Sequence, residues 1–263
     1  MRARIIDLDQ LLDNAITAIK EAGKVIWELY QSDSVKPGYI LSDNPTTIAD
    51  KISNQVISKI LSQTGLPILS EEGKMIAFQE RKYWNDYWLI DPLDGTKEFM
   101  QKINEFTVNI ALIRKGRPLM GLIYVPCTDC LYYGSQKTGC HKIENGKKTI
   151  IKPLEQRLRF IDLLQKAHVT MALSRSHTLD DAKNFLSQFK LVTPVVMGSA
   201  LKFIWVIENK ADLYLRMGST REWDIAAAHA IFHSLNRGVY QLDCKSELVY
   251  NKPDLINPSF IAF

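Results

Sequence analysis

The sequence has few cysteines and no long apolar run. Four of its 263 residues are cysteines, and the longest apolar stretch, "LMGLIYV" at 119–125, is far shorter than the roughly 20 residues that cross a bilayer. The first residues, "MRARIIDLDQLLDNA", pass from two arginines to acidic residues without an unbroken apolar core, so we interpret them as a folded helix and not as a signal peptide. These features predict a protein of a reducing compartment, the cytoplasm, with no integral membrane segment.

A strong charge of either sign is also absent. The formal net charge is +4, it is scattered, and no run of like charges or low-complexity tract occurs. Proteins that bind nucleic acid usually concentrate basic residues on one face, so this distribution argues against a nucleic-acid partner. Acidic small molecules remain compatible with it.

Three of the four cysteines lie close together in the sequence. Cys127 and Cys130 have C-x-x-C spacing, and Cys140 precedes His141. Such a group can form a zinc knuckle or a redox pair, but zinc ligands usually come as two compact halves and a redox C-x-x-C should open a helix. Because "GLIYVPCTDCLYYG" reads as two strands joined by a short turn, we favour simple thiols on a hairpin.

Apolar periodicity predicts helices first, then mostly antiparallel strands, and then strands alternating with helices. A helix is expected over 8–29, with Asp7 and Gln10 as a candidate capping box. A second helix should start at residue 46 or 47 and end at Gly65. The later elements are expected as strands at 66–69, 86–91, 106–114, 117–125, 168–174, 191–197, 211–216 and 238–242, and as helices at 178–189, 199–209 and 222–235. This order predicts an α/β protein of two packed halves, an α+β half over 1–155 and an α/β half over 156–263.

The segment "DPLDGT" brings two carboxylates into one turn. Pro92 cannot extend a hydrogen-bonded ladder, so it should turn the chain directly after Asp91 and let Asp91 and Asp94 point into one space. The turn also leaves the carbonyl of Leu93 available. Oxygen ligands of this kind select a hard cation, Mg²⁺ or Mn²⁺, over zinc.

A helix start follows these carboxylates directly. Gly95 and Thr96 should open a helix, "GTKEFMQKI", whose unpaired N–H groups and dipole favour phosphate. Carboxylates for metal ions beside an anion site suggest phosphoryl chemistry with two ions. The aspartyl-phosphate phosphatases are a rival, but their signature is D-x-D-G-T and the spacing here is one residue longer, which argues against a phosphoenzyme.

Four segments together resemble the lithium-sensitive, magnesium-dependent phosphatase family that includes inositol monophosphatases, fructose bisphosphatases and 3′(2′),5′-bisphosphate nucleotidases. They are "NPTTIAD" at 44–50, "LSEEG" at 69–73, "DPLDGTKEF" at 91–99 and "WDIAAAHA" at 223–230, in the family's order along nearly the whole chain. Within the family the chain is most similar to the bacterial nucleotidases. The resemblance implies a layered αβαβα sandwich, with metal ions held by the first half and substrate bound by the second.

The resemblance also implies the metal ligands. Glu71, Asp91 and the Leu93 carbonyl would hold a first Mg²⁺, and Asp91, Asp94 and Asp224 would hold a second, with Mn²⁺ as an alternative ion. The catalytic residues would be Glu71 and Thr96, which hold an attacking water activated by metal, and Asp50, which lies near that water. Li⁺ should inhibit by competing at a Mg²⁺ site.

The substrate implied by the resemblance is a small phosphate ester, adenosine 3′,5′-bisphosphate (PAP) or its sulfated form PAPS. "DGTKEF" resembles the nucleotidase version of the motif, since inositol monophosphatases usually carry Asn where Glu98 stands. The substrate-binding residues would be Asp94, Gly95, Thr96, His177, Ser199, Lys202, Arg216 and Asp224. A substrate with two phosphates needs extra cationic donors, and Arg can bind a phosphate through two hydrogen bonds. His177 capping a helix and Lys202 on a solvated helix face are the alternative interpretations.

The expected reaction is hydrolysis of PAP to AMP and phosphate, which would place the protein in sulfur assimilation. Inositol monophosphatase or another sugar-phosphate phosphatase is the alternative enzyme, and a non-catalytic binder is a further one, although the ligand set is intact. Two departures from the family pattern are Ala228 in place of a glycine and a shortened segment around Asp43 and Asn44. Relatives occur as monomers and homodimers. Some attach peripherally to the inner membrane, for which this sequence shows no amphipathic signature.

Overall fold

The computed structural model describes residues 7–32, 45–175 and 179–263, without the side chains of 45–47 and 179–181. Asp43, Asn44 and His177, which we singled out in the sequence, lie outside the described residues. No helix among the residues described is long and apolar enough to cross a membrane.

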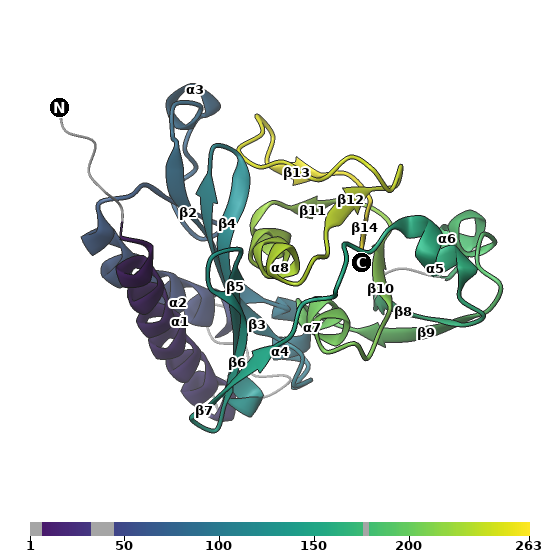
Figure 1. The fold of residues 1–263 in the computed structure, drawn as a ribbon. Helices are drawn as coiled ribbons and strands as arrows, with labels where there is room; N and C mark the ends of the chain where they lie inside the picture. Colours follow the sequence, from purple (N-terminus) through teal and green to yellow (C-terminus); the bar gives the residue numbers. More distant parts are fainter. Residues whose placement is uncertain (1–6, 33–44, 176–178) are drawn as a thin grey trace.

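Two long helices form the first layer of the molecule (Figure 1). They are α1, Leu8–Gln31, and α2, Pro45–Leu61, which is followed by the 3₁₀ turn η2, Ser62–Thr64. The carboxylate of Asp7 caps α1 by accepting from the backbone N–H of Asp9 and Gln10, and Gly65 ends the second helical segment in a left-handed conformation. Both predicted helices are therefore confirmed.

A seven-stranded sheet forms the second layer, with its strands in sequence order. The strands are β1, Ile68–Ser70; β2, Asp86–Asp94; β3, Thr107–Arg114; β4, Arg117–Val125; β5, Cys130–Ser135; β6, Gly139–Glu144; and β7, Lys147–Ile151. β1 runs parallel to β2, and every later neighbour is antiparallel. Short helical segments, α3 at Phe78–Arg81, α4 at Thr96–Met100 and η3 at Pro126–Thr128, interrupt the chain between strands.

The third layer consists of two helices between the sheets, α7, Leu201–Ile207, and α8, Trp223–Ser234. α8 lies almost directly on the first sheet. A Cβ atom at Gly121 of β4 would lie 2.0 Å from the backbone oxygen of Ala227, so only glycine permits this approach. Ala228, where the family pattern has glycine, is buried in this layer.

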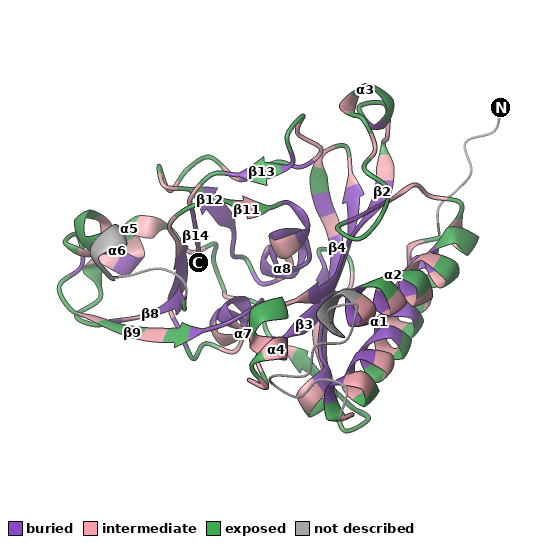
Figure 2. Ribbon diagram, turned by 180° about the vertical axis from the view of Figure 1, so that it is seen from behind, coloured by how far each residue is buried: buried purple, intermediate pink, exposed green. Residues whose placement is uncertain are grey.

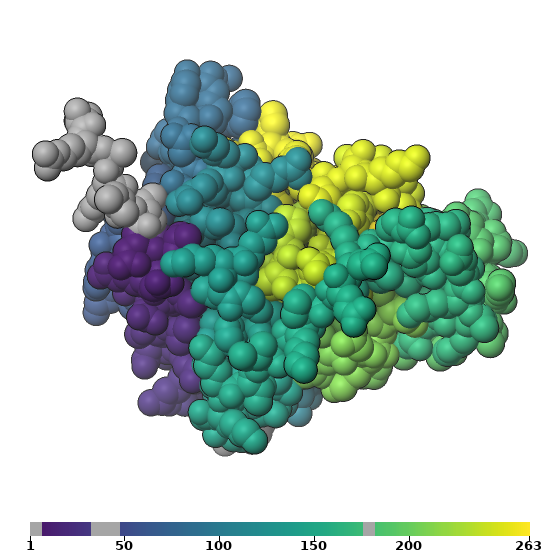
Figure 3. Space-filling model, in the orientation of Figure 1, coloured from purple at the N-terminus to yellow at the C-terminus, as the bar shows by residue number. Residues whose placement is uncertain are grey.

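A five-stranded sheet and two outer helices complete the molecule. The sheet has the order β12-β14-β10-β8-β9. Its strands are β8, Val169–Ser174; β9, Val192–Met197; β10, Leu213–Arg216; β12, Val239–Gln241; and β14, Phe260–Ala262, and the outer helices are α5, Phe160–Gln165, and α6, Leu179–Leu186. A small two-stranded sheet pairs β11, Thr220–Arg221, with β13, Ile256–Asn257. In the space-filling view the C-terminal residues, in yellow, lie between the blue and teal first sheet and the green outer part (Figure 3).

Three apolar clusters fill the four interfaces between these layers. One joins the α1–α2 layer to the first sheet, the largest fills the space around α7 and α8, and the third lies between the second sheet and α5 with α6. Figure 2 shows the buried residues concentrated in the two sheets and on the inner faces of the helices. The five layers are the αβαβα sandwich that the sequence predicted.

The structure differs from the sequence prediction in several elements. β2 does not end at Asp91 but continues to Asp94 through a shift in its register with β3. The helix after Gly95 is one short turn, Thr96–Met100, and not a helix over 95–103. β6, β7, α5 and β14 were not predicted; β14 lies inside the second sheet, between β12 and β10, so "GVYQL" is not the last strand.

Candidate active site

Three acidic side chains from distant parts of the sequence converge at one edge of the first sheet. Because β1 and β2 are parallel, their carboxyl ends share that edge, and the backbone N–H of Glu71 donates to the Ile90 carbonyl at 3.2 Å. Asp224 enters from the first turn of α8. One carboxylate oxygen from each of Glu71, Asp91 and Asp224 can be chosen so that all lie within 4.8 Å of one another.

The irregular end of β2 adds a fourth carboxylate. The backbone N–H of Leu93 donates to Asp91 Oδ1 at 3.2 Å, which folds the chain back over the aspartate. Asp94 then faces the second half of the molecule, where Ser199 Oγ donates to its Oδ2 at 2.8 Å. The strand therefore carries Asp91 and Asp94 on one short irregular segment, although it does not end at Asp91 as expected.

Mutual repulsion and burial set the charge state of this cluster. Burial raises the pKa of Asp91 well above its usual range, and the charges of Asp94 and Glu71 raise it further. Burial, with the charge of Asp94, raises the pKa of Asp224 to about 8. Four carboxyl groups so placed cannot all ionise without a compensating positive charge.

Asp50 lies at the edge of the same cluster. It is a buried residue of α2, and burial, followed by the charges of Glu72 and Glu71, raises its pKa to about 8. The structure thus brings Asp50 to the site from a separate helix. Sequence reasoning alone would have treated it as a solvated helix residue.

The cluster fits divalent cations of the hard type. Its donors are all oxygens, as Mg²⁺ and Mn²⁺ prefer. Within the described part of the chain no lysine, arginine or histidine forms an ion pair with these carboxylates. Metal ions would therefore supply the positive charge that the cluster needs.

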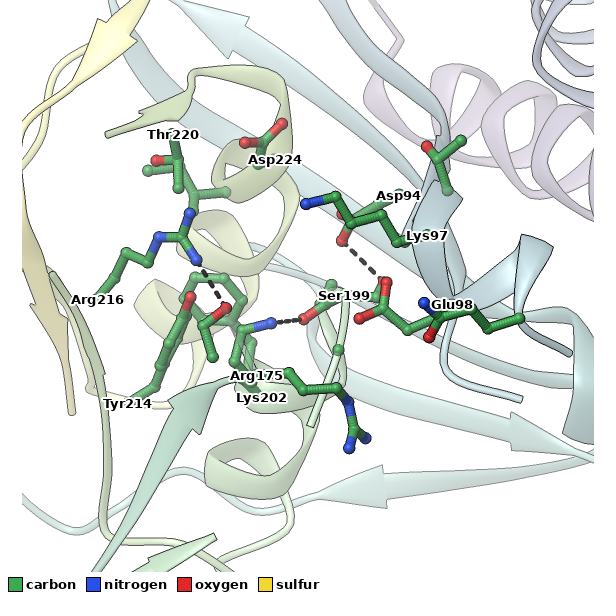
Figure 4. A pocket seen from close by; sticks show the side chains of 18 residues that line it. Asp94, Lys97, Glu98, Arg175, Ser199, Lys202, Tyr214, Arg216, Thr220 and Asp224 are labelled. Atoms are coloured by element: carbon green, nitrogen blue, oxygen red, sulfur yellow. Dashed lines mark hydrogen bonds between the residues drawn. The ribbon is translucent and has the colours of Figure 1, made fainter. Parts of the chain in front are cut away.

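A pocket of about 520 Å³ opens beside the cluster, between the two halves (Figure 4). Asp94 and Asp224 form one wall, and Gly95, in a left-handed conformation, and Thr96 form its rim. A Cβ at Gly95 would lie 2.6 Å from the carbonyl oxygen of Glu105, so glycine is required there. The Thr96 hydroxyl donates to the Leu93 carbonyl at 3.4 Å, a long hydrogen bond that leaves it able to turn toward a ligand.

Two cations form a second wall of the pocket. Lys202 is 6% exposed, and its ammonium donates to the Ser199 carbonyl at 2.5 Å; burial lowers its pKa to about 8. Arg216 donates from Nη1 to Ser174 Oγ at 2.7 Å, while its buried Nε has no hydrogen-bond partner among the residues that the structure describes. The interpretation of Lys202 as a solvated helix residue is therefore wrong.

Further polar residues of the pocket were not identified from the sequence. Glu105 Oε2 accepts from the backbone N–H of Gly198 and from Arg175, both at 2.6 Å, and so fixes the loop before Ser199. Ser199 has a positive φ of 52°, and its hydroxyl also contacts Thr107 Oγ1 at 2.8 Å. Arg175 lies two residues before His177 in the sequence, and its nearness to that predicted residue was the signal that could have identified it.

The structure brings together nearly all the site residues predicted from the sequence. The residues that line the pocket or the adjacent carboxylate cluster are Asp50, Glu71, Asp91, Leu93, Asp94, Gly95, Thr96, Ser199, Lys202, Arg216 and Asp224. His177 lies outside the described residues. The Cys127–Cys130 group is elsewhere, at η3 and β5, with both thiols free.

Comparisons with known proteins agree with this geometry. The model of the inositol monophosphatase family matches residues 7–261. The 3′(2′),5′-bisphosphate nucleotidase CysQ of Buchnera aphidicola is 38% identical over 225 residues, which cover 84% of this chain and 81% of that protein. The CysQ of Salmonella typhimurium is 35% identical over 255 residues, covering 95% and 98%. The crystal structure of CysQ from Bacteroides thetaiotaomicron superposes with a TM-score of 0.81 at 37% identity over 95% of each chain.

Proposed function

This chain belongs to the inositol monophosphatase family, and we propose that it is a 3′(2′),5′-bisphosphate nucleotidase that hydrolyses PAP to AMP and phosphate. Two relatives that align with this chain over most of their length, at 35–38% identity, carry that name. The observation on which the proposal rests is the pocket itself, whose lining combines a carboxylate wall, Asp94 and Asp224, with a cationic wall, Lys202 and Arg216.

The two walls suit a substrate with two phosphates. We assign the phosphate to be cleaved to the carboxylate wall, where Glu71, Asp91, the Leu93 carbonyl, Asp94 and Asp224 would hold divalent cations, Mg²⁺ in the first place and Mn²⁺ as an alternative. When bound, such ions neutralise phosphoryl oxygens and activate water. An inositol monophosphate has no second phosphate for the cationic wall.

The protein's own groups then position the reactants. The Glu71 carboxylate accepts a proton of the attacking water and the Thr96 hydroxyl orients it, while Asp50 lies behind them at the end of the cluster. Water attacks phosphorus directly and in line, so no protein side chain acts as the nucleophile. Lys202 and Arg216 hold the phosphate that is not cleaved by charge-assisted hydrogen bonds. The hydrogen bond from Ser199 to Asp94 orients that carboxylate and the loop on which Ser199 lies.

In this proposal the two halves of the chain have different roles, one in metal binding and the other in substrate binding. Residues 1–155 contribute most of the metal ligands, and residues 156–263 contribute Ser199, Lys202 and Arg216 for substrate. Asp224 is the exception, because it comes from the second half and closes the carboxylate cluster.

A substrate panel tests the proposal. Phosphate release from PAP, AMP and inositol 1-phosphate is measured with Mg²⁺ and with a chelator, and we expect PAP to be strongly preferred and Li⁺ to inhibit. Arg216→Gln should lower kcat/KM for PAP by about 10–100-fold, since a charged hydrogen bond contributes about 1.5–3 kcal/mol, and should affect inositol 1-phosphate less. A preference for inositol 1-phosphate in the unaltered protein would reverse the proposal.

A further inference from the structure

A second cluster of metal-ligating side chains lies on α8, away from the carboxylates. His229 and His233 are one helical turn apart on that helix, and their rings meet edge to face with centroids 4.5 Å apart. Glu247 approaches them from the segment after β12, which a bridge between Tyr240 and Glu247 holds in place. One ligand atom from each of His229, His233 and Glu247 can be chosen so that all three lie within 4.8 Å of one another.

His229 carries a buried nitrogen without a partner. The residue is fully buried, and its Nδ1 lies 2.9 Å from the Tyr250 hydroxyl, while Nε2 has no hydrogen-bond partner among the described residues. A buried polar atom without a partner is unfavourable, so a ligand that pairs with it stabilises the fold. Burial lowers the pKa of His229 well below its usual value, so the ring is neutral. A neutral imidazole whose other nitrogen is held by a hydrogen bond is the form in which histidine binds metal.

The remaining two groups have the spacing of metal ligands. His233 Nε2 lies 3.4 Å from Glu247 Oε1. Two ligand atoms at about 2.0–2.1 Å from a tetrahedral ion lie about 3.3 Å apart.

Two arginines also contact the Glu247 carboxylate. Arg157 Nη2 donates to Oε1, the oxygen that faces His233, and Arg117 Nη1 lies 3.6 Å from Oε2. Ligating carboxylates commonly accept such outer hydrogen bonds, which fix their orientation. Glu247, Arg117 and Arg157 also line a surface groove, which gives an ion a path from solvent.

We propose that His229, His233 and Glu247 form a second metal site, which takes a borderline divalent ion such as Zn²⁺. Two imidazoles and one carboxylate suit Zn²⁺, whereas the all-oxygen cluster at the start of α8 suits Mg²⁺. The two sites are separate: His229 and His233 lie about 7.5 and 13.5 Å beyond Asp224 along the helix. An ion bound there links α8 to the segment after β12 and satisfies the buried Nε2 of His229.

Metal binding to the whole protein in excess Mg²⁺ tests this proposal. Zn²⁺ binding is measured by competition with a chromophoric chelator, and the visible spectrum of added Co²⁺ reports its ligands. We expect one tight ion per chain, which Mg²⁺ does not displace. His233→Gln should weaken it by at least about 100-fold, and Tyr250→Phe, which removes only the partner of Nδ1, by about 10–100-fold. The His233→Gln variant should keep the Mg²⁺-dependent phosphatase activity. Retained activity would show that the variant is folded.

Two control variants make the result decisive. His168→Gln alters an exposed histidine bonded to Thr193 and should leave Zn²⁺ binding unchanged. Asp224→Asn alters the carboxylate cluster and should also leave it unchanged. Equal Zn²⁺ affinity in the unaltered protein and in His233→Gln, loss of the ion in Asp224→Asn alone, or no tight Zn²⁺ in the unaltered protein would each overturn the proposal.

Discussion

Lys202 carries a buried ammonium group beside the carboxylates of the pocket. Burial lowers its pKa to about 8, and the nearby charge of Asp94 partly offsets that effect. Its hydrogen bonds go to the Ser199 and Met197 carbonyls, which direct the nitrogen but leave its charge for an anion. The affinity of the free enzyme for a second phosphate should therefore depend on pH near the top of the physiological range.

Replacing Lys202 by arginine should remove this dependence. In the unaltered protein kcat/KM for PAP should fall as pH rises through about 8, because Lys202 loses its proton there. Lys202→Arg stays protonated to beyond about pH 12, so its alkaline limb should move upward. Initial steady-state rates of phosphate release, measured across pH, check this prediction. Inositol 1-phosphate is the control substrate. The same limb in both proteins would show that another group titrates.

At the residue scale, Asp91 and Asp94 could be chosen as metal-ligand candidates from their spacing, whereas Glu71 and Asp224 were implied by the resemblance to the phosphatase family. Asp91 and Asp94 are three residues apart, and the turn between them could be read locally. Glu105 could not be chosen, because its role depends on accepting hydrogen bonds from Gly198 and Arg175, far along the chain. The burial of Lys202 was missed for a similar reason, since it depends on the layers around α7.

α8 is the element on which the site depends most. It begins with Trp223 and Asp224 and is buried for nearly its whole length between the sheets. The contact of Gly121 with the Ala227 backbone sets how deeply the helix sits against β4. Any change in that depth moves the Asp224 carboxylate relative to Asp91.

Gly121→Ala should therefore affect both stability and catalysis. The new methyl group would overlap the Ala227 carbonyl, and overpacking of this kind costs about 1–3 kcal/mol or more. We expect a lower thermal midpoint together with a lower kcat at saturating Mg²⁺, measured by calorimetry and phosphate release. The control is Gly139→Ala, whose Cβ meets no atom within 4 Å and which carries only backbone strain at a φ of 74°. Full kcat in Gly121→Ala would mean that α8 does not set the ligand geometry.

Element types with strong periodicity could be predicted from the sequence, and those fixed by pairing could not. α1 has an apolar stripe and a capping residue, so its bounds were nearly correct. β14 is three residues long and becomes a strand by pairing on both sides with β10 and β12. The α4 helix ends after one turn, although its sequence continues with helix-forming residues.

At the scale of the whole molecule, the carboxylate cluster is a source of instability that metal binding removes. The folded protein holds protons on Asp224 up to about pH 8, whereas the usual pKa is 3.8. Between these values folding takes up protons, so the stability of the metal-free protein falls as pH rises. Bound cations would keep the carboxylates ionised and remove this dependence.

Thermal unfolding in a chelator and in excess Mg²⁺ tests this behaviour. In the chelator, the protein should lose roughly 3 kcal/mol from Asp224 alone between about pH 5 and pH 7.5. Mg²⁺ should flatten the dependence and raise the midpoint at the higher pH. Asp224→Asn should make the dependence shallower without metal, although Asp91 and Asp50 still contribute to it, and should lose most of the phosphatase activity. A chelated protein as stable at the higher pH as at the lower one would contradict the raised pKa.

The position of β14 determines the order in which the two sheets can form during synthesis. This strand fills the gap between β10 and β12, so the second sheet stays divided until Phe260–Ala262 have left the ribosome, long after the consecutive strands of the first sheet could pair. The nascent chain therefore carries an unfinished sheet edge from the synthesis of β10 until that of β14, and a premature stop codon a few positions before 260 would release a protein with two unmatched edges, a substrate for chaperones and proteases.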